Sequence, residues 1–180
     1  MSSALFYSTT SGLTRTEVEK IVHEMPNARL HAEFLGTFSK DTLPPFRLHT
    51  CSVINIQDSV APDGSALPGT HWVCAGVTED PWYFDSFGLD IPIAIKDRLS
   101  VFGKVAHTQK QIQACESTEC GWYSVACCDY MTTHTHNAGH TLDYFTSLFD
   151  SPILKKNDET LKNYINKRKN HSGVSVDYRT

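Results

Sequence analysis

The sequence has no apolar run that approaches the roughly 18 residues of a membrane-spanning helix. Its first residues, Met1 to Tyr7, lack both a basic segment and a long apolar core, so we expect no secretory signal peptide. Of the 180 residues, 40% are hydrophobic and 20% are charged, which is typical of a folded globular protein and excludes a disordered one. The length predicts one domain over residues 1–180.

A strong excess of either charge is also missing, since 16 Lys and Arg residues stand against 20 Asp and Glu residues. This balance argues against a nucleic-acid-binding surface over the whole protein. Residues 155–180 nevertheless carry seven basic and three acidic side chains, a net +4, which leaves −8 for residues 1–154. We interpret residues 155–180 as a basic C-terminal helix and tail with a solvated face. Weak nucleic-acid contact would run through Lys155, Lys156, Lys162, Lys167, Arg168 and Lys169.

No C-x-x-C pair occurs, although the chain contains six cysteines. Without such a pair or a secretory signal, a structural zinc site and a disulfide framework are both disfavoured. Most of the cysteines have apolar neighbours and are expected to pack in the core as small hydrophobic side chains. One of them remains a candidate nucleophile, and Cys115 and Cys120 compete for that role.

Local patterns place strands in the middle of the chain and helices towards both ends. A capping box of Thr14 and Glu17 begins the first helix. Residues 33–38 and 43–46 are expected to be rich in loops, and residues 58–69 to form a long turn region. The other expected elements are strands over residues 50–56, 71–77, 82–85 and 110–114, and helices over 90–102, from Cys120 onward, 142–149 and 158–167. This order predicts an α+β fold.

Four polar residues in a particular order indicate chemistry. His71 begins a strand after a glycine turn, and Asp85 ends the next strand, so the carboxylate can orient the imidazole as a general base. Cys120 begins a buried helix, where the macrodipole favours a thiolate. Gln113 offers an amide for an oxyanion beside the backbone N–H of Cys120. Together they predict a cysteine hydrolase, although His71 alone is compatible with a core histidine and Asp85 with a turn residue.

The same residues resemble the adenain family, the adenovirus maturation proteases, with relatives in other DNA viruses and large DNA transposons. The resemblance covers roughly residues 13–150. Its motifs are Phe34-Leu35-Gly36-Thr37-Phe38, Gly69-Thr70-His71-Trp72, Phe84-Asp85-Ser86-Phe87-Gly88, and Gln113 with Cys120-Gly121. It implies a central mixed sheet flanked by helices, with the catalytic cysteine at a helix N-terminus. By resemblance His71 is the base, Asp85 its orienter, Cys120 the nucleophile and Gln113 an oxyanion-hole donor, with Trp72 and Gly121 forming the site wall.

The resemblance further implies a monomeric endopeptidase of the virion and host nucleus, which cleaves viral capsid and core precursor proteins near glycines. Asp85 stands where adenain has glutamate, as in the proteases of ubiquitin-like modifiers. Adenain uses DNA and a peptide tethered through a cysteine, but Phe102 occupies the corresponding position here and the chain is acidic. We therefore expect that neither cofactor is required. The alternatives are an isopeptidase that removes a ubiquitin-like modifier, and a catalytically inactive binding module.

A second histidine-rich segment contains His134, His136 and His140. The last two have the helical H-x-x-x-H spacing of zinc ligands. Asn137 occupies the place of the glutamate that a metalloprotease needs, and Gly139 weakens a helix there. We expect a solvated helix end rather than a metal site.

Overall fold

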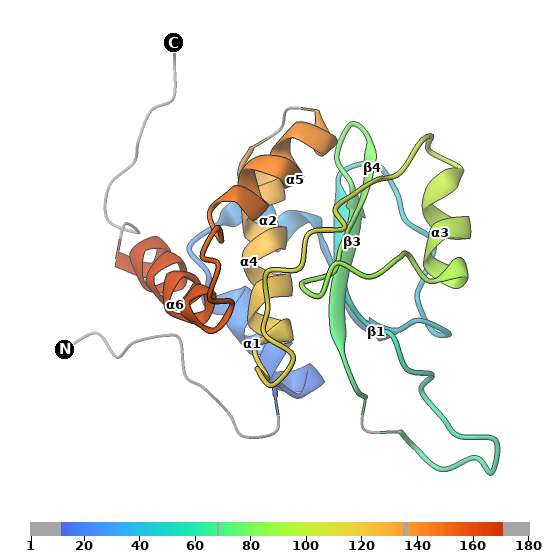
Figure 1. The fold of residues 1–180 in the computed structure, drawn as a ribbon. Helices are drawn as coiled ribbons and strands as arrows, with labels where there is room; N and C mark the ends of the chain where they lie inside the picture. The colour runs from blue at the N-terminus through green and yellow to red at the C-terminus, as the bar shows by residue number, and fades with distance from the viewer. Residues whose placement is uncertain (1–11, 68, 135–136, 171–180) are drawn as a thin grey trace.

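The computed structural model describes residues 12–67, 69–134 and 137–170. Within these ranges the middle of the chain forms a five-stranded sheet (Figure 1). The strands, in their spatial order, are β1 (Phe34–Ser39), β2 (Thr50–Asn55), β3 (Trp72–Val77), β4 (Pro81–Phe84) and β5 (Ala106–His107). The three central strands pair antiparallel, whereas β1 runs parallel to β2 and β5 runs parallel to β4. A mixed sheet with flanking helices confirms the predicted α+β class.

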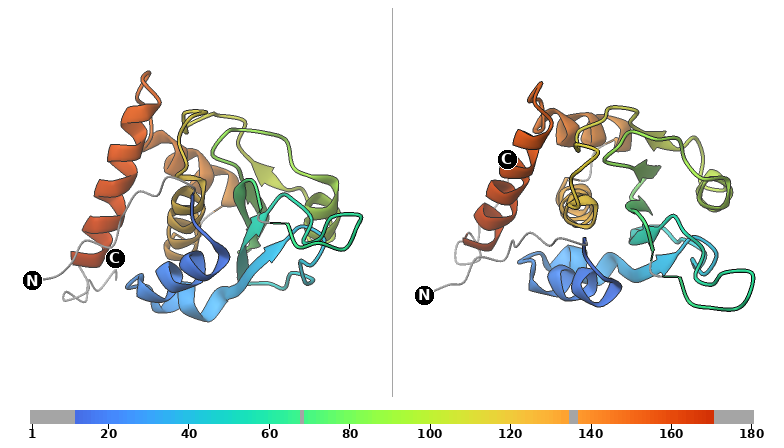
Figure 2. Two further views of the ribbon diagram at one scale, coloured as in Figure 1. Left: turned by 90° about the horizontal axis from the view of Figure 1, so that it is seen from below. Right: turned by 60° about the horizontal axis from the view of Figure 1, so that its bottom comes forward.

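Helices cover both faces of the sheet. They are α1 (Arg15–Glu24), α2 (Ala28–Glu33), α3 (Ile93–Ser100), α4 (Cys120–Thr133), α5 (Ala138–Ser147) and α6 (Lys155–Asn170). α4 packs against β2 and β3, and α1, α2, α5 and α6 pack around α4, whereas α3 lies on the opposite face (Figure 1). Both views of Figure 2 place α6 on the outer side of α4, away from the sheet. Because neighbours surround α4, nearly all its side chains are buried.

The two faces of β3 contribute to two separate cores. Cys74 joins the larger core on the α4 side, while Val73, Ala75 and Val77 join a smaller core with Ile95 of α3. Alternate side chains of a strand point to opposite faces, so a strand covered on both sides is apolar throughout. All six residues of β3 are accordingly buried.

The predicted start of α1 is confirmed in detail. The N–H of Thr14 donates to Oε2 of Glu17 at 2.8 Å, and the N–H of Glu17 donates to Oγ1 of Thr14 at 3.3 Å, which completes the capping box. The apolar face that follows this capping box, Val18, Ile21, Val22 and Met25, is at most 1% exposed. The capping box therefore marks the start of α1 at Arg15, as the sequence predicted.

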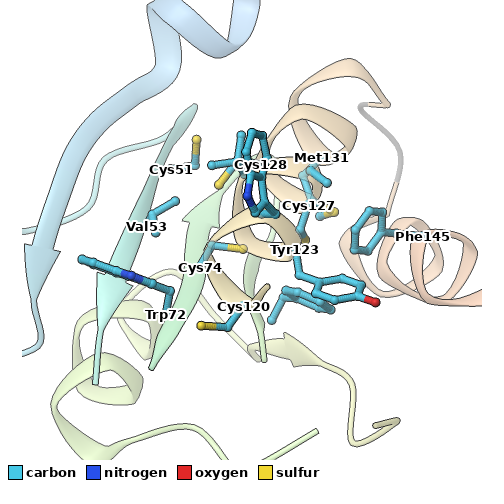
Figure 3. Close-up of a cluster of buried hydrophobic side chains, with 14 of the residues drawn as sticks. Cys51, Val53, Trp72, Cys74, Cys120, Tyr123, Cys127, Cys128, Met131 and Phe145 are labelled. Carbon is cyan, nitrogen blue, oxygen red and sulfur yellow. The ribbon is translucent and has the colours of Figure 1, made fainter. Parts of the chain in front are cut away.

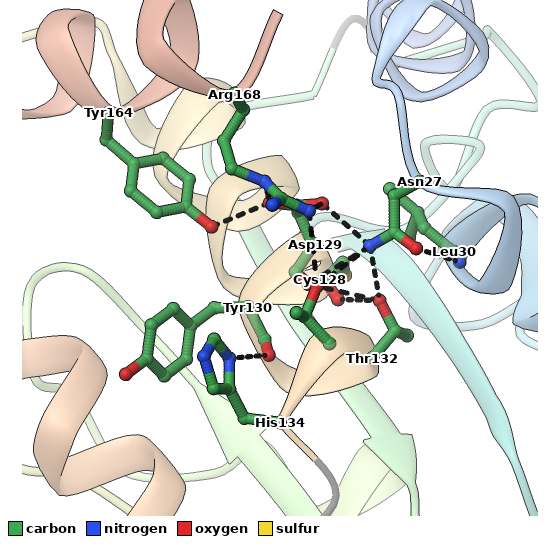
Figure 4. A network of polar contacts seen from close by, with 10 residues as sticks. Asn27, Leu30, Cys128, Asp129, Tyr130, Thr132, His134, Tyr164 and Arg168 are labelled. Carbon is green, nitrogen blue, oxygen red and sulfur yellow. Dashed lines mark hydrogen bonds and ion pairs between the residues drawn. The ribbon is translucent and has the colours of Figure 1, made fainter. Parts of the chain in front are cut away.

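A buried carboxylate fastens α6 and the start of α2 to α4 (Figure 4). Oδ1 and Oδ2 of Asp129 accept hydrogen bonds from Nη2 and Nε of Arg168 at 3.0 and 2.8 Å. Tyr164 donates to the same carboxylate at 2.6 Å, and Asn27, the N-cap of α2, donates at 2.7 Å. Asp129 is 0% exposed, so this charge is stable only because all these donors compensate it.

Two predicted segments were wrong. Residues 34–39, within the expected loop passage, form β1, because pairing with β2 over a bulge at Phe34/Gly36 outweighs the weak strand tendency of a glycine. Residues 110–114, expected to be a strand, are not one. The N–H groups of Ile112 and Gln113 both donate to the single carbonyl of Ser86, at 2.9 and 3.0 Å, so no ladder of successive pairs forms.

The other helices were predicted with shifted ends. α3 begins at Ile93, three residues after the expected start at 90, whereas α5 and α6 begin before residues 142 and 158. The six-residue α2 and the two-residue β5 were not predicted. No helix within the described ranges has the length and apolar character needed to cross a membrane.

Candidate active site

The β3–β4 pairing brings His71 and Asp85 together. His71 directly precedes β3 and Asp85 directly follows β4, and because the two strands are antiparallel these positions share one end of the sheet. Nε2 of His71 lies 2.9 Å from Oδ1 of Asp85, a hydrogen bond with the ring nitrogen as donor to the carboxylate. Both side chains are buried. The predicted contact between these residues is therefore present.

Two contacts of Phe87 fix this pair. The backbone N–H of Phe87 donates to Oδ1 of Asp85 at 2.7 Å, within a turn closed by the N–H of Gly88 on the Asp85 carbonyl. The Phe87 ring stacks on the imidazole of His71 with 4.6 Å between centroids and 27° between planes. The carboxylate holds one edge of the imidazole and the phenyl ring covers one face, so the imidazole has little freedom to rotate.

Cys120 is the first residue of α4 and lies in the same cavity as His71. This cavity has a volume of about 430 Å³, and its lining includes His71, Trp72, Phe87, Cys115 and Cys120. Nδ1 of His71, the nitrogen not bound to Asp85, is buried and has no hydrogen-bond partner of ordinary geometry among the described residues. Contacts between catalytic groups are often loose before substrate binds. The ring thus presents Nδ1 for exchange with the thiol.

The surroundings of His71 favour its charged form. Burial by itself would lower the pKa of the imidazole, but the hydrogen bond to Asp85 and the adjacent Cys120 thiol outweigh it and raise the pKa to about 9. The ring is therefore an imidazolium at neutral pH. The charged ring lines the same cavity as Cys120, the first residue of α4.

The four other buried cysteines belong to the core, as predicted. Cys51, Cys74, Cys127 and Cys128 lie among the apolar side chains of the larger core, and Cys120 lies at the edge of that core, as the first residue of α4 (Figure 3). Burial raises the pKa of the Cys74, Cys127 and Cys128 thiols. The hydrogen bond with Cys128, together with burial, raises that of Cys51. These thiols stay neutral, which leaves Cys120 and the exposed Cys115 as candidate nucleophiles.

Gln113 lies close to the site but does not line the cavity. Its side chain is fully buried; Nε2 donates to the carbonyl of Ser117 at 2.8 Å, and Oε1 accepts from the hydroxyl of Ser86 at 2.6 Å. One amide hydrogen is therefore bound within the protein. In the structure Gln113 ties the loop that precedes Cys120 to the residue that follows Asp85.

Trp72 and Gly121 meet at Leu13, which forms part of the cavity wall. The indole N–H of Trp72 donates to the carbonyl of Leu13 at 2.7 Å. A Cβ at Gly121 would lie 3.0 Å from Leu13 and 3.3 Å from Trp72, so glycine allows both side chains to pack on the start of α4. Trp72 lines the cavity as predicted, whereas Gly121 is buried behind that wall.

Leu13, Asn55 and Phe87 are site residues that sequence reasoning did not identify. In the sequence, Leu13 precedes a helix N-cap and Phe87 lies in a turn, so a structural role explains each of them and neither indicates a site. Only the spatial pairing of Asn55 with Trp72 across β2 and β3 carries Asn55 to the site.

The histidine-rich segment lies only partly in the described residues, since residue 136 is outside them. Nδ1 of His134 lies 3.0 Å from the carbonyl of Tyr130, and its ring stacks on the Tyr130 ring at 4.1 Å. His140 is exposed on α5. Across residues 12–67, 69–134 and 137–170, no three His, Cys, Asp or Glu side chains are grouped to hold a metal ion.

Comparison of the chain with models of known protein families and with curated protein sequences finds no match.

Proposed function

We propose that the protein is a cysteine endopeptidase with Cys120 as nucleophile, His71 as general base and acid, and Asp85 as the group that orients His71. The observation that carries this proposal is the placement of His71, bound to Asp85 through Nε2 and lining one cavity with Cys120. A pKa raised to about 9 supports it, because the proton that the leaving amine needs is then already on the ring.

The proposed reaction has two stages. The Cys120 sulfur attacks the carbonyl carbon of a peptide bond, and the C–N bond breaks as the His71 imidazolium gives a proton to the leaving amine. This forms a thioester on Cys120. His71, now neutral, takes a proton from water while the water oxygen attacks the thioester carbon. The C–S bond then breaks with its electron pair on sulfur, the acid product leaves, and the thiolate and imidazolium are restored.

An oxyanion develops in both stages, and the start of α4 supports its stabilisation. The first N–H groups of an α-helix have no acceptor within the helix, and Cys120 is the first residue of α4. The backbone N–H of Cys120 is the principal donor in this proposal. Gln113, predicted as a second donor, is bound to Ser86 and Ser117 and does not line the cavity, so this proposal does not use it.

The proposed substrates are viral capsid and core precursor proteins, cleaved near glycines in the virion or the host nucleus by a monomer that requires no cofactor. The substrates, the location and the monomeric state rest on the resemblance to adenain, whereas the absence of a required cofactor rests on Phe102 and the acidic net charge, which depart from it. A cavity partly walled by Gly12 and Gly69, without bulky side chains at those points, is compatible with a peptide of small residues.

The test incubates the purified protein with the capsid and core precursors encoded beside it, with and without DNA, and in parallel with ubiquitin-like modifier conjugates. Cleavage of precursors without DNA, abolished in Cys120→Ala, is the expected result. Cleavage of the modifier conjugates alone would assign an isopeptidase. A Cys120→Ala protein with full activity, or an inert wild type, would refute the proposed mechanism.

A further inference from the structure

Asn55 brings an amide to the wall of the candidate active site. It is the last residue of β2 and pairs with Trp72, the residue after the proposed base. It is only 3% exposed, yet it lines the same cavity as His71 and Cys120. Nothing in the proposed reaction uses this polar side chain.

Two backbone donors fix the orientation of the Asn55 amide. The N–H of Gln57 donates to Oδ1 of Asn55 at 2.9 Å, and the N–H of Thr70 donates to the same oxygen at 3.3 Å. An N–H group cannot pair with the amide nitrogen, so the oxygen must occupy this position and Nδ2 must point away from it. The neighbouring chain thus holds the amide in a single orientation.

The nitrogen Nδ2 has no acceptor among the described residues, since both hydrogen bonds of the amide are made by Oδ1. Asn55 lines the cavity, so Nδ2 is the end of its amide left for a ligand there. Gly69 has φ +86° and lies directly against this amide, where a Cβ would collide with Nδ2 and Cγ. Glycine at position 69 leaves the amide its space.

We propose that Asn55 binds substrate, with Nδ2 donating a hydrogen bond to a backbone carbonyl oxygen of a peptide in the cleft. The assignment rests on the proposed peptidase function. The ligand class follows from the wall: the described residues that line the cavity include no lysine or arginine, so an anionic ligand finds no matching side-chain charge except at His71. The Asn55 amide is a neutral donor held in one orientation, in a wall that includes Gly12 and Gly69. Such a donor suits the neutral backbone carbonyl of an extended peptide.

Asn55→Asp is the decisive variant because it removes the donor and keeps the acceptor for both backbone N–H groups. Gln57→Glu is its matched control: Oε1 of Gln57 accepts from the N–H of Gly69 at 2.9 Å, and Gln57 does not line the cavity. It adds the same charge nearby without altering a donor in the cleft. Asn55→Ser serves as a second variant if Asn55→Asp unfolds at a lower temperature than wild type.

The experiment measures the rate at which Cys120 reacts with two probes, iodoacetamide and an acetyl-Ala-Ala-Gly-Gly vinyl sulfone. Iodoacetamide has no peptide chain, so its rate reports only the state of Cys120 and His71. We expect Asn55→Asp to lower the rate of reaction with the peptidyl probe by about 10- to 100-fold. The substitution removes one hydrogen-bond donor and places a carboxylate opposite the carbonyl oxygen of the probe. The iodoacetamide rate should stay within about threefold, as should both rates of Gln57→Glu.

Each other result decides the matter. A peptidyl rate that falls no further in Asn55→Asp than in Gln57→Glu would overturn the assignment of Asn55. Equal losses with both probes would also overturn it, since Asn55 would then act through Thr70 on His71. If the peptidyl probe does not label Cys120 of the wild type, the proposed peptidase function itself fails.

Discussion

The bond between His71 and Asp85 makes stability depend on pH in a way that one substitution can isolate. The pKa of His71 rises from 6.5 to about 9 in the folded protein. A folded-state pKa above the unfolded value means that folding favours the protonated ring. The resulting stabilisation is fully present below about pH 6.5 and disappears as the pH rises through about 9.

The magnitude follows from the shift in pKa. At 1.36 kcal/mol per unit, the difference corresponds to about 3 kcal/mol, shared between Asp85 and Cys120. Asp85→Asn keeps an acceptor for Nε2 but removes the negative charge. The free energy of unfolding of the wild type should therefore exceed that of Asp85→Asn. This excess should be larger at about pH 6 than at about pH 10, by up to about 3 kcal/mol.

Urea unfolding of both proteins at several pH values measures this difference, and groups common to both cancel. Asp97→Asn is the control, because it makes the same chemical change at an exposed position of α3. NMR titration of the His71 ring gives the pKa directly. Two results would refute the argument. One is a difference in free energy of unfolding between wild type and Asp85→Asn that stays constant within about 0.5 kcal/mol across this pH range, and the other is a His71 ring that titrates near 6.5.

Three further outcomes are expected. Cys120→Ala should abolish peptide hydrolysis while Cys115→Ala keeps most of it, as measured by cleavage assays; equal losses would contradict this. Asp129→Ala should lower the free energy of unfolding by about 3–5 kcal/mol in urea titrations, because buried partners lose their acceptor. Replacement of Lys155 and Lys156 by glutamate should remove most of the weak, salt-dependent retention of the protein on a DNA column. Unchanged retention would place the contact with DNA elsewhere.

The sequence predicted the parts of the site that depend on local signals. His71 after a glycine turn and Asp85 at a strand end become neighbours by hairpin pairing alone, so their positions along the chain suffice. Cys120 could be placed because a buried helix begins there. By contrast, β1 depends on parallel pairing with β2, and β5 on parallel pairing with β4. Such pairings join separate segments, and no local pattern predicts them.

Residue type alone also could not distinguish a polar group that faces the cleft from one used inside the protein. Gln113 has the right type and spacing for an oxyanion donor, but its amide bridges Ser86 and Ser117. Asn55 resembles any strand-end asparagine, and only the two N–H groups on its oxygen show which end of the amide is left for a ligand. The orientation of an amide depends on its partners, which become visible only in the folded chain.

In the basic C-terminal helix, the sequence likewise could not show which charged side chains are used inside the protein. Arg168, counted in the sequence as a cation for nucleic acid, forms two hydrogen bonds with the buried carboxylate of Asp129. Leu161 and Ile165 of the same helix are fully buried, so deletion of α6 would remove part of the core together with the charge. Because α6 packs on α4, and α4 begins at Cys120, that deletion would also disturb the proposed nucleophile. Loss of activity after truncation would therefore say nothing about nucleic acid, and only substitution of exposed lysines separates the two roles.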